Sequence, residues 1–181
     1  MSMTLYHGTT SLFTEIDINA GEDYKDFGKG FYLSADKKRA ENIAKRNKKI
    51  LLKKAEISKE AITAIAYCYE VDFDESVLES TTLNIKRFES ADIEWIRFIM
   101  FNRGHKGKQH PYDIVIGPTA DDATTAILNR YRRIYNEEYS ESIMRKIIED
   151  VKPEVYPTQY YFGTREAVRS LTIHPGRRYT V

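Results

Sequence analysis

The sequence predicts a mixed α+β domain in which short strands and short helices are interleaved. Three observations support this fold class. Short runs of β-branched and aromatic residues recur along the chain, capped amphipathic stretches lie between them, and Gly, Pro, Asn or Asp residues separate the two. Because the strands are short and irregularly spaced, we expect an α+β architecture rather than a regular βαβ repeat.

The first predicted strand ends at a glycine, and the second follows a turn that contains glycine. Residues 4–7 (TLYH) are strand-like and end at Gly8, and residues 27–34 (FGKGFYLS) run from a glycine turn into a second short strand. Asp36 is placed to cap a helix that follows. One face of that helix consists of Ala40, Ile43 and Ala44.

The middle of the chain predicts two strands and a helix. Residues 61–73 alternate as a strand does, and residues 83–88 resemble another strand. One face of the longer strand consists of Ile65, Tyr67, Tyr69, Val71 and Phe73. Ser90 then caps a helix that ends at Gly104 and carries the single tryptophan, Trp95. The apolar residues of that helix include Ile93, Ile96 and Met100.

The last third predicts a core strand, two helices and a final strand and helix. Residues 112–117 (YDIVIG) are β-branched, and Asp121 and Asp122 can cap the helix after them. Helical stretches then extend to Val151, with residues 136–138 open to interpretation as helix or loop. Residues 159–162 predict a strand and residues 164–171 a capped helix, followed by an extended tail.

Composition narrows the class of protein. At 181 residues, we expect one domain spanning residues 1–181. Lys plus Arg (28) and Asp plus Glu (27) nearly cancel, so the whole chain carries no field that attracts nucleic acid or a membrane. Cys68 is the only cysteine, which excludes a disulfide framework and a cysteine-based zinc site. Without a signal peptide or an apolar span, we expect a cytoplasmic protein with no membrane partner.

Three segments together resemble the motif strands of ADP-ribosyltransferases: LYHGTT, FGKGFYLSAD and QYYFGT. The match is to the His-Tyr-Glu branch, which includes diphtheria toxin and the poly(ADP-ribose) polymerases. The run from KDFGKGFYLS through NR and YDIVIGPTADD to TQYYFGT further resembles a bacterial family of formerly unknown function in that superfamily, with Gln as the third motif residue. The resemblance covers nearly the whole chain.

This resemblance implies an ADP-ribosyltransferase-like split mixed β-sheet with an NAD cleft, flanked by short helices. His7 would hydrogen-bond the adenosine ribose, the backbone of Gly8 would meet the nicotinamide amide, and Tyr32 would stack on the nicotinamide ring. A neutral imidazole can both donate and accept, and glycine allows close approach to the backbone. The expected NAD-binding set is His7, Gly8, Thr9, Gly30, Tyr32 and Ser34, with His7, Tyr32 and Gln159 catalytic.

Gly28 and Gly30 would permit the tight turn that presents Tyr32. Taken alone, this pair is weak evidence for nucleotide binding, because G-x-G without a third glycine is common. A glycine turn beside a core tyrosine explains the segment equally well when it is read in isolation. The functional interpretation therefore depends on the three motifs occurring together and in order.

Gln159 stands where the His-Tyr-Glu branch carries glutamate. Glutamine keeps a hydrogen bond to the nicotinamide ribose but lacks the charge that stabilises the developing oxocarbenium ion. A charge about 5 Å away at an effective dielectric near 20 is worth roughly 3 kcal/mol, or on the order of a hundredfold in rate. An acidic substrate or a nearby carboxylate could supply the missing charge, and the candidate carboxylates are Asp113, Asp121, Asp122 and Glu166. We expect transfer of a single ADP-ribose, because chain elongation needs the glutamate to activate a ribose hydroxyl.

Three functions are compatible with the sequence. The first is a mono-ADP-ribosyltransferase acting on a protein or nucleic-acid target, which the family context links to a toxin with an antitoxin partner. The second is an NAD or ADP-ribose binding module without catalysis. The third is nucleic-acid binding through the basic stretch from Lys37 to Lys59, whose alternative explanation is a solvated helix face.

His105 and His110 flank a polar loop, and no metal is expected there.

Overall fold

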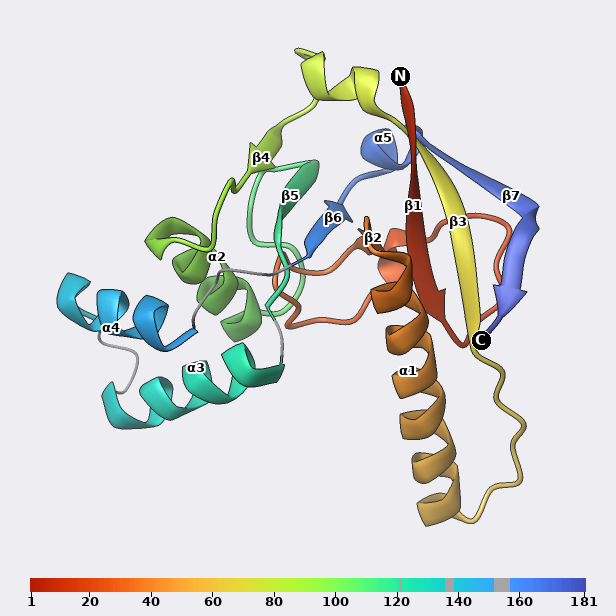
Figure 1. Cartoon of the computed structure of the whole chain (residues 1–181), viewed down its shortest axis with the longest axis horizontal. Helices are drawn as coiled ribbons and strands as arrows, with labels where there is room; N and C mark the ends of the chain where they lie inside the picture. Colours follow the sequence, from red (N-terminus) through yellow and green to blue (C-terminus); the bar gives the residue numbers. More distant parts are fainter. Residues whose placement is uncertain (121, 136–138, 152–156) are drawn as a thin grey trace.

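The computed structural model describes residues 1–120, 122–135, 139–151 and 157–181. Strands and helices are interleaved along the chain, so the predicted mixed α+β class is confirmed (Figure 1). The strands are β1 (Ser2–Thr9), β2 (Phe31–Ser34), β3 (Tyr67–Asp74), β4 (Ile85–Arg87), β5 (Ile114–Pro118), β6 (Thr158–Phe162) and β7 (Leu171–Thr180). The helices are α1 (Lys37–Ser58), α2 (Ile93–Gly104), α3 (Asp122–Tyr135), α4 (Glu141–Val151) and α5 (Arg165–Val168).

The strands form one mixed seven-stranded sheet in the order β4-β5-β6-β2-β1-β3-β7. β4 and β5 are parallel, and the other neighbouring strands are antiparallel. The sheet is unevenly paired. β1 pairs with β3 along its whole length, whereas in the described part of the chain β1 pairs with β2 at one register position, Tyr6 with Ser34. Two well-paired halves, β4-β5-β6-β2 and β1-β3-β7, therefore meet at a weakly paired junction.

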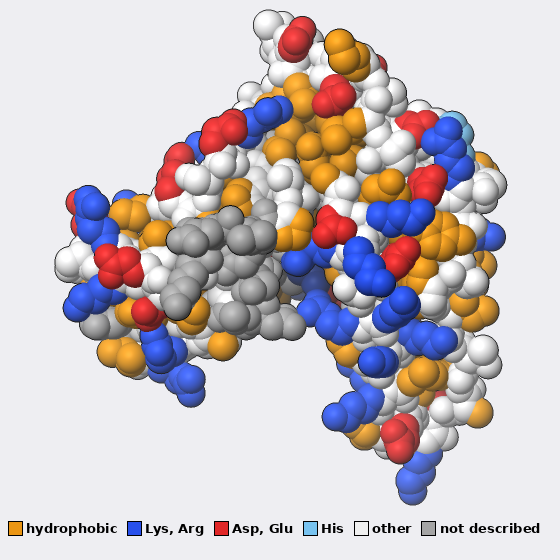
Figure 2. Space-filling view, viewed as in Figure 1, with side chains coloured by type: hydrophobic (Ala, Val, Ile, Leu, Met, Phe, Trp, Pro, Cys, Tyr) orange, Lys and Arg blue, Asp and Glu red, His pale blue; other side chains and the backbone are white. Residues whose placement is uncertain are grey.

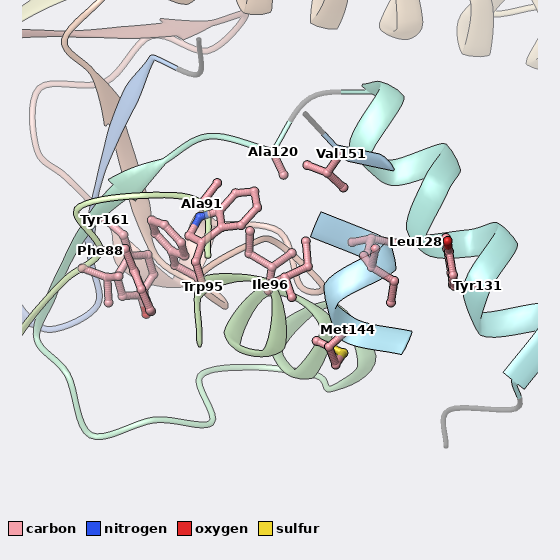
Figure 3. Close-up of a cluster of buried hydrophobic side chains, with 14 residues drawn as sticks. Phe88, Ala91, Trp95, Ile96, Ala120, Leu128, Tyr131, Met144, Val151 and Tyr161 are labelled. Atoms are coloured by element: carbon pink, nitrogen blue, oxygen red, sulfur yellow. The ribbon is translucent and has the colours of Figure 1, made fainter. Parts of the chain in front are cut away.

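Apolar side chains fill both faces of the first half of the sheet. On β5, Val115 joins one buried cluster while Ile114 and Ile116 join the other, and on β6 Tyr161 and Phe162 divide in the same way. This division follows from the alternation of side chains along a strand. The cluster of Val115 and Tyr161 is closed by α2, α3 and α4, with the fully buried Trp95, Ile96 and Met144 among its members (Figure 3).

Helix α1 packs on the other half of the sheet and then extends beyond it (Figure 1). Asp36 caps its first turn, as predicted, by accepting a hydrogen bond from the backbone N–H of Arg39 at 3.2 Å. The helix contacts β1 so closely that a Cβ on Gly8 would lie 1.8 Å from the carbonyl oxygen of Ala40. None of the helices in the described ranges is long and apolar enough to cross a membrane.

Two of the predicted helix limits are wrong. The cap of α2 is Asp92 rather than Ser90, because the Asp92 carboxylate accepts from the N–H of Trp95 at 2.9 Å. The helix predicted over residues 164–171 is only the four-residue α5, whose N-terminal cap is Thr164. From Leu171 the chain instead forms β7, which pairs with β3, so the predicted tail is a sheet strand.

The strand predicted over residues 61–73 begins later than expected. Residues 61–66 lie outside β3, and Ile65, predicted on the same strand face as Tyr69 and Val71, is 42% exposed. The remaining pattern is confirmed, since Tyr69, Val71 and Phe73 are buried. The helix-or-loop segment 136–138 and the capping residue Asp121 lie outside the described residues.

Candidate functional site

The three motif residues lie on three strands that are neighbours in the sheet. His7 is on β1, Tyr32 on β2 and Gln159 on β6, and the sheet order places β2 between the other two. Ser34 pairs with both Tyr6 of β1 and Gln159 of β6. Segments separated by more than a hundred residues in the sequence therefore converge around the weakly paired β1–β2 junction.

His7 spans this junction with its side chain. Its Nδ1 lies 2.8 Å from the carbonyl oxygen of Tyr32, just past the last β1–β2 backbone pair. The ring stacks on Phe31 at 4.5 Å between centroids and meets the edge of Phe13. Burial among these rings lowers the pKa of His7, and the bond to the Tyr32 carbonyl partly offsets that effect. Because a carbonyl only accepts, Nδ1 carries the proton and neutral His7 keeps Nε2 as an acceptor.

Tyr32 is fixed by the glycine turn that precedes it. Its hydroxyl donates to the carbonyl of Gly28 at 2.7 Å and accepts from the N–H of Phe27 at 3.0 Å. Gly28 has a φ of 83°, a left-handed conformation that favours glycine. Burial, followed by the nearby Asp26 carboxylate, raises the pKa of the Tyr32 hydroxyl well above its usual range. The hydroxyl therefore stays protonated and holds the turn, while the ring is half-buried.

His7 and Tyr32 point to opposite faces of the sheet. Tyr6 pairs directly with Ser34, so Tyr32 lies on the face of Tyr6, and His7 lies on the other face beside Phe31. A ligand that contacts both side chains would have to lie where the pairing of β1 with β2 ends, a place called the gap below. Gly8 and Thr9 border the same gap, because they follow His7 on β1.

The other predicted binding residues have local structural roles. A Cβ on Gly30 would lie 2.4 Å from the Tyr161 ring, so this glycine is needed for packing against β6. The Thr9 hydroxyl accepts from the N–H of Ser11, and the Ser34 hydroxyl accepts from the N–H of Asp36. Gly8 is covered on one side by α1. These contacts explain the residue types at the four positions without a ligand.

Gln159 is buried, with 8% of its surface exposed, and its amide nitrogen donates two hydrogen bonds. Nε2 lies 3.1 Å from Oδ2 of Asp26 and 3.4 Å from the carbonyl oxygen of Pro118. A carboxylate and a carbonyl only accept, so the nitrogen must face them. Within the described part of the chain, Oε1 of Gln159 accepts no hydrogen bond and remains available as an acceptor.

The carboxylate beside Gln159 is Asp26, which the sequence did not single out as a site residue. Of the four carboxylates considered, Asp113 binds the N–H of Asn84 at the opposite end of β5, and Glu166 is exposed on α5. Asp121 and the side chain of Asp122 lie outside what the structure describes. The available signal was the position of Asp26 directly before the FGKGFYLS segment, in a stretch whose own pattern is irregular.

The basic stretch forms the outer face of α1. Its lysines are mostly exposed, whereas Ala40, Ala44 and Ala55 are buried. Figure 2 shows the surface hollowed between α1 and the helices α3 and α4, with Lys and Arg side chains along the hollow. The second half of α1 also exposes aliphatic side chains, including Ile57 at 74%. Such residues gain nothing from a phosphate backbone, so they do not favour nucleic acid as a partner.

The two loop histidines bind backbone carbonyls rather than each other. His105 contacts the carbonyl of Phe101 at 2.7 Å, and His110 contacts that of Phe27 at 2.8 Å. Burial lowers the pKa of His110, with Lys108 nearby acting in the same direction and the bond to Phe27 opposing it. Within the described residues, no group of three or more His, Cys, Asp or Glu side chains is arranged to hold a metal ion.

Comparison with known families places the chain in one of them. A family model described as "Protein of unknown function (DUF3990)" matches residues 3–173, which includes all three motif strands. The chain belongs to this family. No curated protein matches the sequence. The family's description names no activity.

Proposed function

We propose that this chain is a mono-ADP-ribosyltransferase that uses NAD as its substrate. The observation that carries the proposal is the convergence of His7, Tyr32 and Gln159 from β1, β2 and β6 on a junction where two half-sheets separate. A split of this kind, with three motif residues around it, is what the resemblance to the His-Tyr-Glu branch leads us to expect. NAD would lie in the gap between β1 and β2.

The tautomer of His7 supports binding to a ribose. Its Nδ1–H is committed to the Tyr32 carbonyl, which leaves Nε2 able to accept a hydrogen bond from a ribose hydroxyl. Its lowered pKa keeps the ring neutral near pH 7, where a protonated ring would lose that acceptor. The Phe13 and Phe31 rings fix the orientation of the imidazole.

Tyr32 and Gln159 would position the nicotinamide half of NAD. The Tyr32 ring is held by its hydroxyl and by the edge of Tyr161 at 5.2 Å between centroids, so it is a rigid platform for an aromatic ligand ring. The free Oε1 of Gln159 can accept a hydrogen bond from a hydroxyl of the nicotinamide ribose.

The reaction breaks the bond between C1′ of the nicotinamide ribose and the ring nitrogen of nicotinamide. The bonding electron pair leaves with nicotinamide, which departs as a neutral molecule, and positive charge develops on the ribose. An O–H or N–H group of the acceptor then attacks C1′ and loses its proton. Acceptors of negative polarity around the ribose stabilise that charge in the transition state. Without a glutamate at residue 159, we expect transfer to stop after one ADP-ribose.

The test is incubation with NAD labelled on the adenosine phosphate, with free nicotinamide and labelled macromolecule measured separately. We expect both products in the presence of a cell extract, and we expect Gln159→Ala to reduce turnover more than NAD affinity. NAD binding without nicotinamide release would instead support a non-catalytic binding module. The absence of both NAD binding and nicotinamide release would reject the proposal.

A toxin–antitoxin role and the identity of the acceptor are further parts of this proposal. Acceptor selection is determined by surface loops, which differ among proteins of one fold. The label on protein or on nucleic acid in the same extract identifies the acceptor class. For nucleic acid, a loss of binding with added salt would indicate the basic face of α1, and no retardation at low salt would exclude it.

A further inference from the structure

We infer that Asp26 is a positioning residue for Gln159 and supplies the negative charge that a glutamine at this position lacks. The inference rests on the proposed function, because it concerns the residue that would face the nicotinamide ribose. Asp26 precedes the glycine turn, and Gln159 is on β6, so the contact joins residues far apart in the chain.

Asp26 is the centre of a buried hydrogen-bond network. Its side chain is only slightly exposed, Oδ2 accepts from Nε2 of Gln159 and from the N–H of Ala120 at 3.3 Å, and Oδ1 accepts from the Arg103 guanidinium. Nη2 of Arg103 lies 2.6 Å from Oδ1, and Nη1 donates to the hydroxyl of Thr125. The network thereby joins the glycine turn, β6, α2 and α3.

This network fixes which atom of the Gln159 amide is free. A side-chain amide can rotate and exchange its oxygen and nitrogen at little cost when both ends meet water. Here the nitrogen faces the Asp26 carboxylate and the Pro118 carbonyl, and the reversed amide would place an oxygen against two acceptors. Asp26 therefore keeps Oε1 as the atom presented to a ligand hydroxyl.

The same contact explains why residue 159 is glutamine. A glutamate would bring a second carboxylate to the distance of the present Nε2–Oδ2 contact, 3.1 Å, where two carboxylates do not both ionise readily. With glutamine, one carboxylate charge lies one hydrogen bond behind the amide, and a bond from Nε2 to a charged acceptor strengthens Oε1 as an acceptor. Arg103 offsets part of this charge, so we expect an effect smaller than that of a glutamate in direct contact.

The decisive variants exchange the two side-chain types. Asp26→Asn should lower kcat for nicotinamide release by about tenfold to a hundredfold, with KM for NAD changed by less than about threefold. Gln159→Glu alone should also lower kcat, because it sets two carboxylates together. The double variant Asp26→Asn with Gln159→Glu restores one donor facing one carboxylate and keeps the net charge, but it loses the contacts to the Pro118 carbonyl and the Ala120 N–H. Its kcat should therefore exceed that of both single variants without reaching the wild-type value.

A purely structural role for Asp26 predicts a different result. Asp26→Asn and the double variant would then be equally impaired, because both leave Arg103 without its carboxylate partner. Asp72→Asn is the matched control, since Asp72 also pairs with an arginine, Arg177, but on β3 away from Gln159. It should leave turnover unchanged. Thermal unfolding of each variant identifies any that fail to fold.

The side-chain amide resonances of Gln159 give a readout that does not depend on turnover. In Asp26→Asn the amide proton loses its charged acceptor, and its NMR signal should move upfield, whereas Asp72→Asn should leave it in place. Wild-type protein that cleaves no NAD would reject the proposed function. Active wild type with full kcat in Asp26→Asn, or a double variant no better than the single variants, would reject the inference about Asp26 alone.

Discussion

The two edges of β1 differ sharply in how they are paired. Along one edge, every residue from Ser2 to Thr9 has a register partner on β3. Along the other edge, within the described residues, the backbone pairs with β2 at Tyr6, and the next contact across is the His7 side chain bonded to the Tyr32 carbonyl. One strand therefore serves as a sheet strand on one side and as the border of a gap on the other.

We expect the edge of β1 that pairs with β3 to contribute mainly to stability, and the edge toward β2 to contribute mainly to the proposed NAD binding. A continuous ladder satisfies the backbone groups of β1 toward β3 and is supported by buried side chains such as Leu5 and Val71. Toward β2, no register pair follows Tyr6 in the described part of the chain, and backbone groups without ladder partners can serve a ligand. Substitutions that act on the two edges should consequently be distinguishable by what they change.

The largest effect is expected where β1 supports the sheet. Leu5→Ala should lower the free energy of unfolding by about 3 kcal/mol, because Leu5 is fully buried and its truncation leaves a cavity. Chemical denaturation followed by circular dichroism measures this change. Ile57→Ala on the exposed part of α1 is the control and should shift stability by less than about 0.5 kcal/mol.

A substitution at the gap should act mainly on binding. His7→Ala removes the side chain that bridges β1 and β2, and we expect NAD affinity to fall by about tenfold or more, equivalent to about 1.4 kcal/mol. Isothermal titration calorimetry measures the affinity. Unchanged NAD binding in both His7→Ala and Tyr32→Ala would remove the basis for a site at this gap.

Lowering the pH should destabilise the folded protein through protonation of His7. Burial lowers the folded-state pKa of His7 below its ordinary value of 6.5, so below that pH the unfolded chain binds the proton first. The contribution of neutral His7 to the free energy of unfolding is therefore fully present above pH 6.5 and is lost as pH falls toward the folded-state pKa. Urea unfolding at several pH values measures the loss.

His110 contributes in the same direction, because burial also lowers its pKa. His7→Gln should therefore remove only part of the pH dependence of stability, and His110→Gln another part. NAD affinity should decrease as the pH is lowered, both in wild type and in His110→Gln, because protonated His7 has no acceptor at Nε2. An NAD affinity independent of pH below 6.5 in both proteins would contradict the assigned tautomer.

The smallest effect on binding is expected for Tyr32→Phe. The Tyr32 hydroxyl is engaged by Phe27 and Gly28, so its removal should cost about 1 kcal/mol of stability through the turn. The ring, which would stack on nicotinamide, is kept. NAD affinity should then change by less than about threefold, whereas Tyr32→Ala should weaken binding clearly more. Equal losses in the two variants would show that the hydroxyl, not the ring, matters for NAD.

Local sequence patterns predicted the strands on both sides of the gap and the strands next to them. Short runs of apolar, aromatic or β-branched residues next to turn residues indicated β1, β2, β5 and β6, and the side chain of Asp36 indicated where α1 begins. These features depend on neighbouring residues, which a sequence displays directly. The pairing order and the single register position between β1 and β2 depend on contacts between distant segments, and no local pattern encodes them.

The errors share the same physical cause. β7 has a polar, mostly exposed pattern with Pro175 and Gly176, and its pairing with β3 rather than its own sequence makes it a strand. Asp26 was missed because its partners Gln159 and Arg103 lie in other elements. The role of Gly30 was also interpreted locally, whereas the Tyr161 ring determines it.

Amide hydrogen exchange with and without saturating NAD tests the location of the site most directly. Binding in the gap should slow exchange at residues 7–9 of β1 and across β2 and the start of β6, because a ligand there covers backbone groups without ladder partners. Exchange along β7 and the outer half of α1 should stay the same. Protection confined to α1, or no protection at β1 and β2 despite bound NAD, would contradict a site at the junction of the two half-sheets.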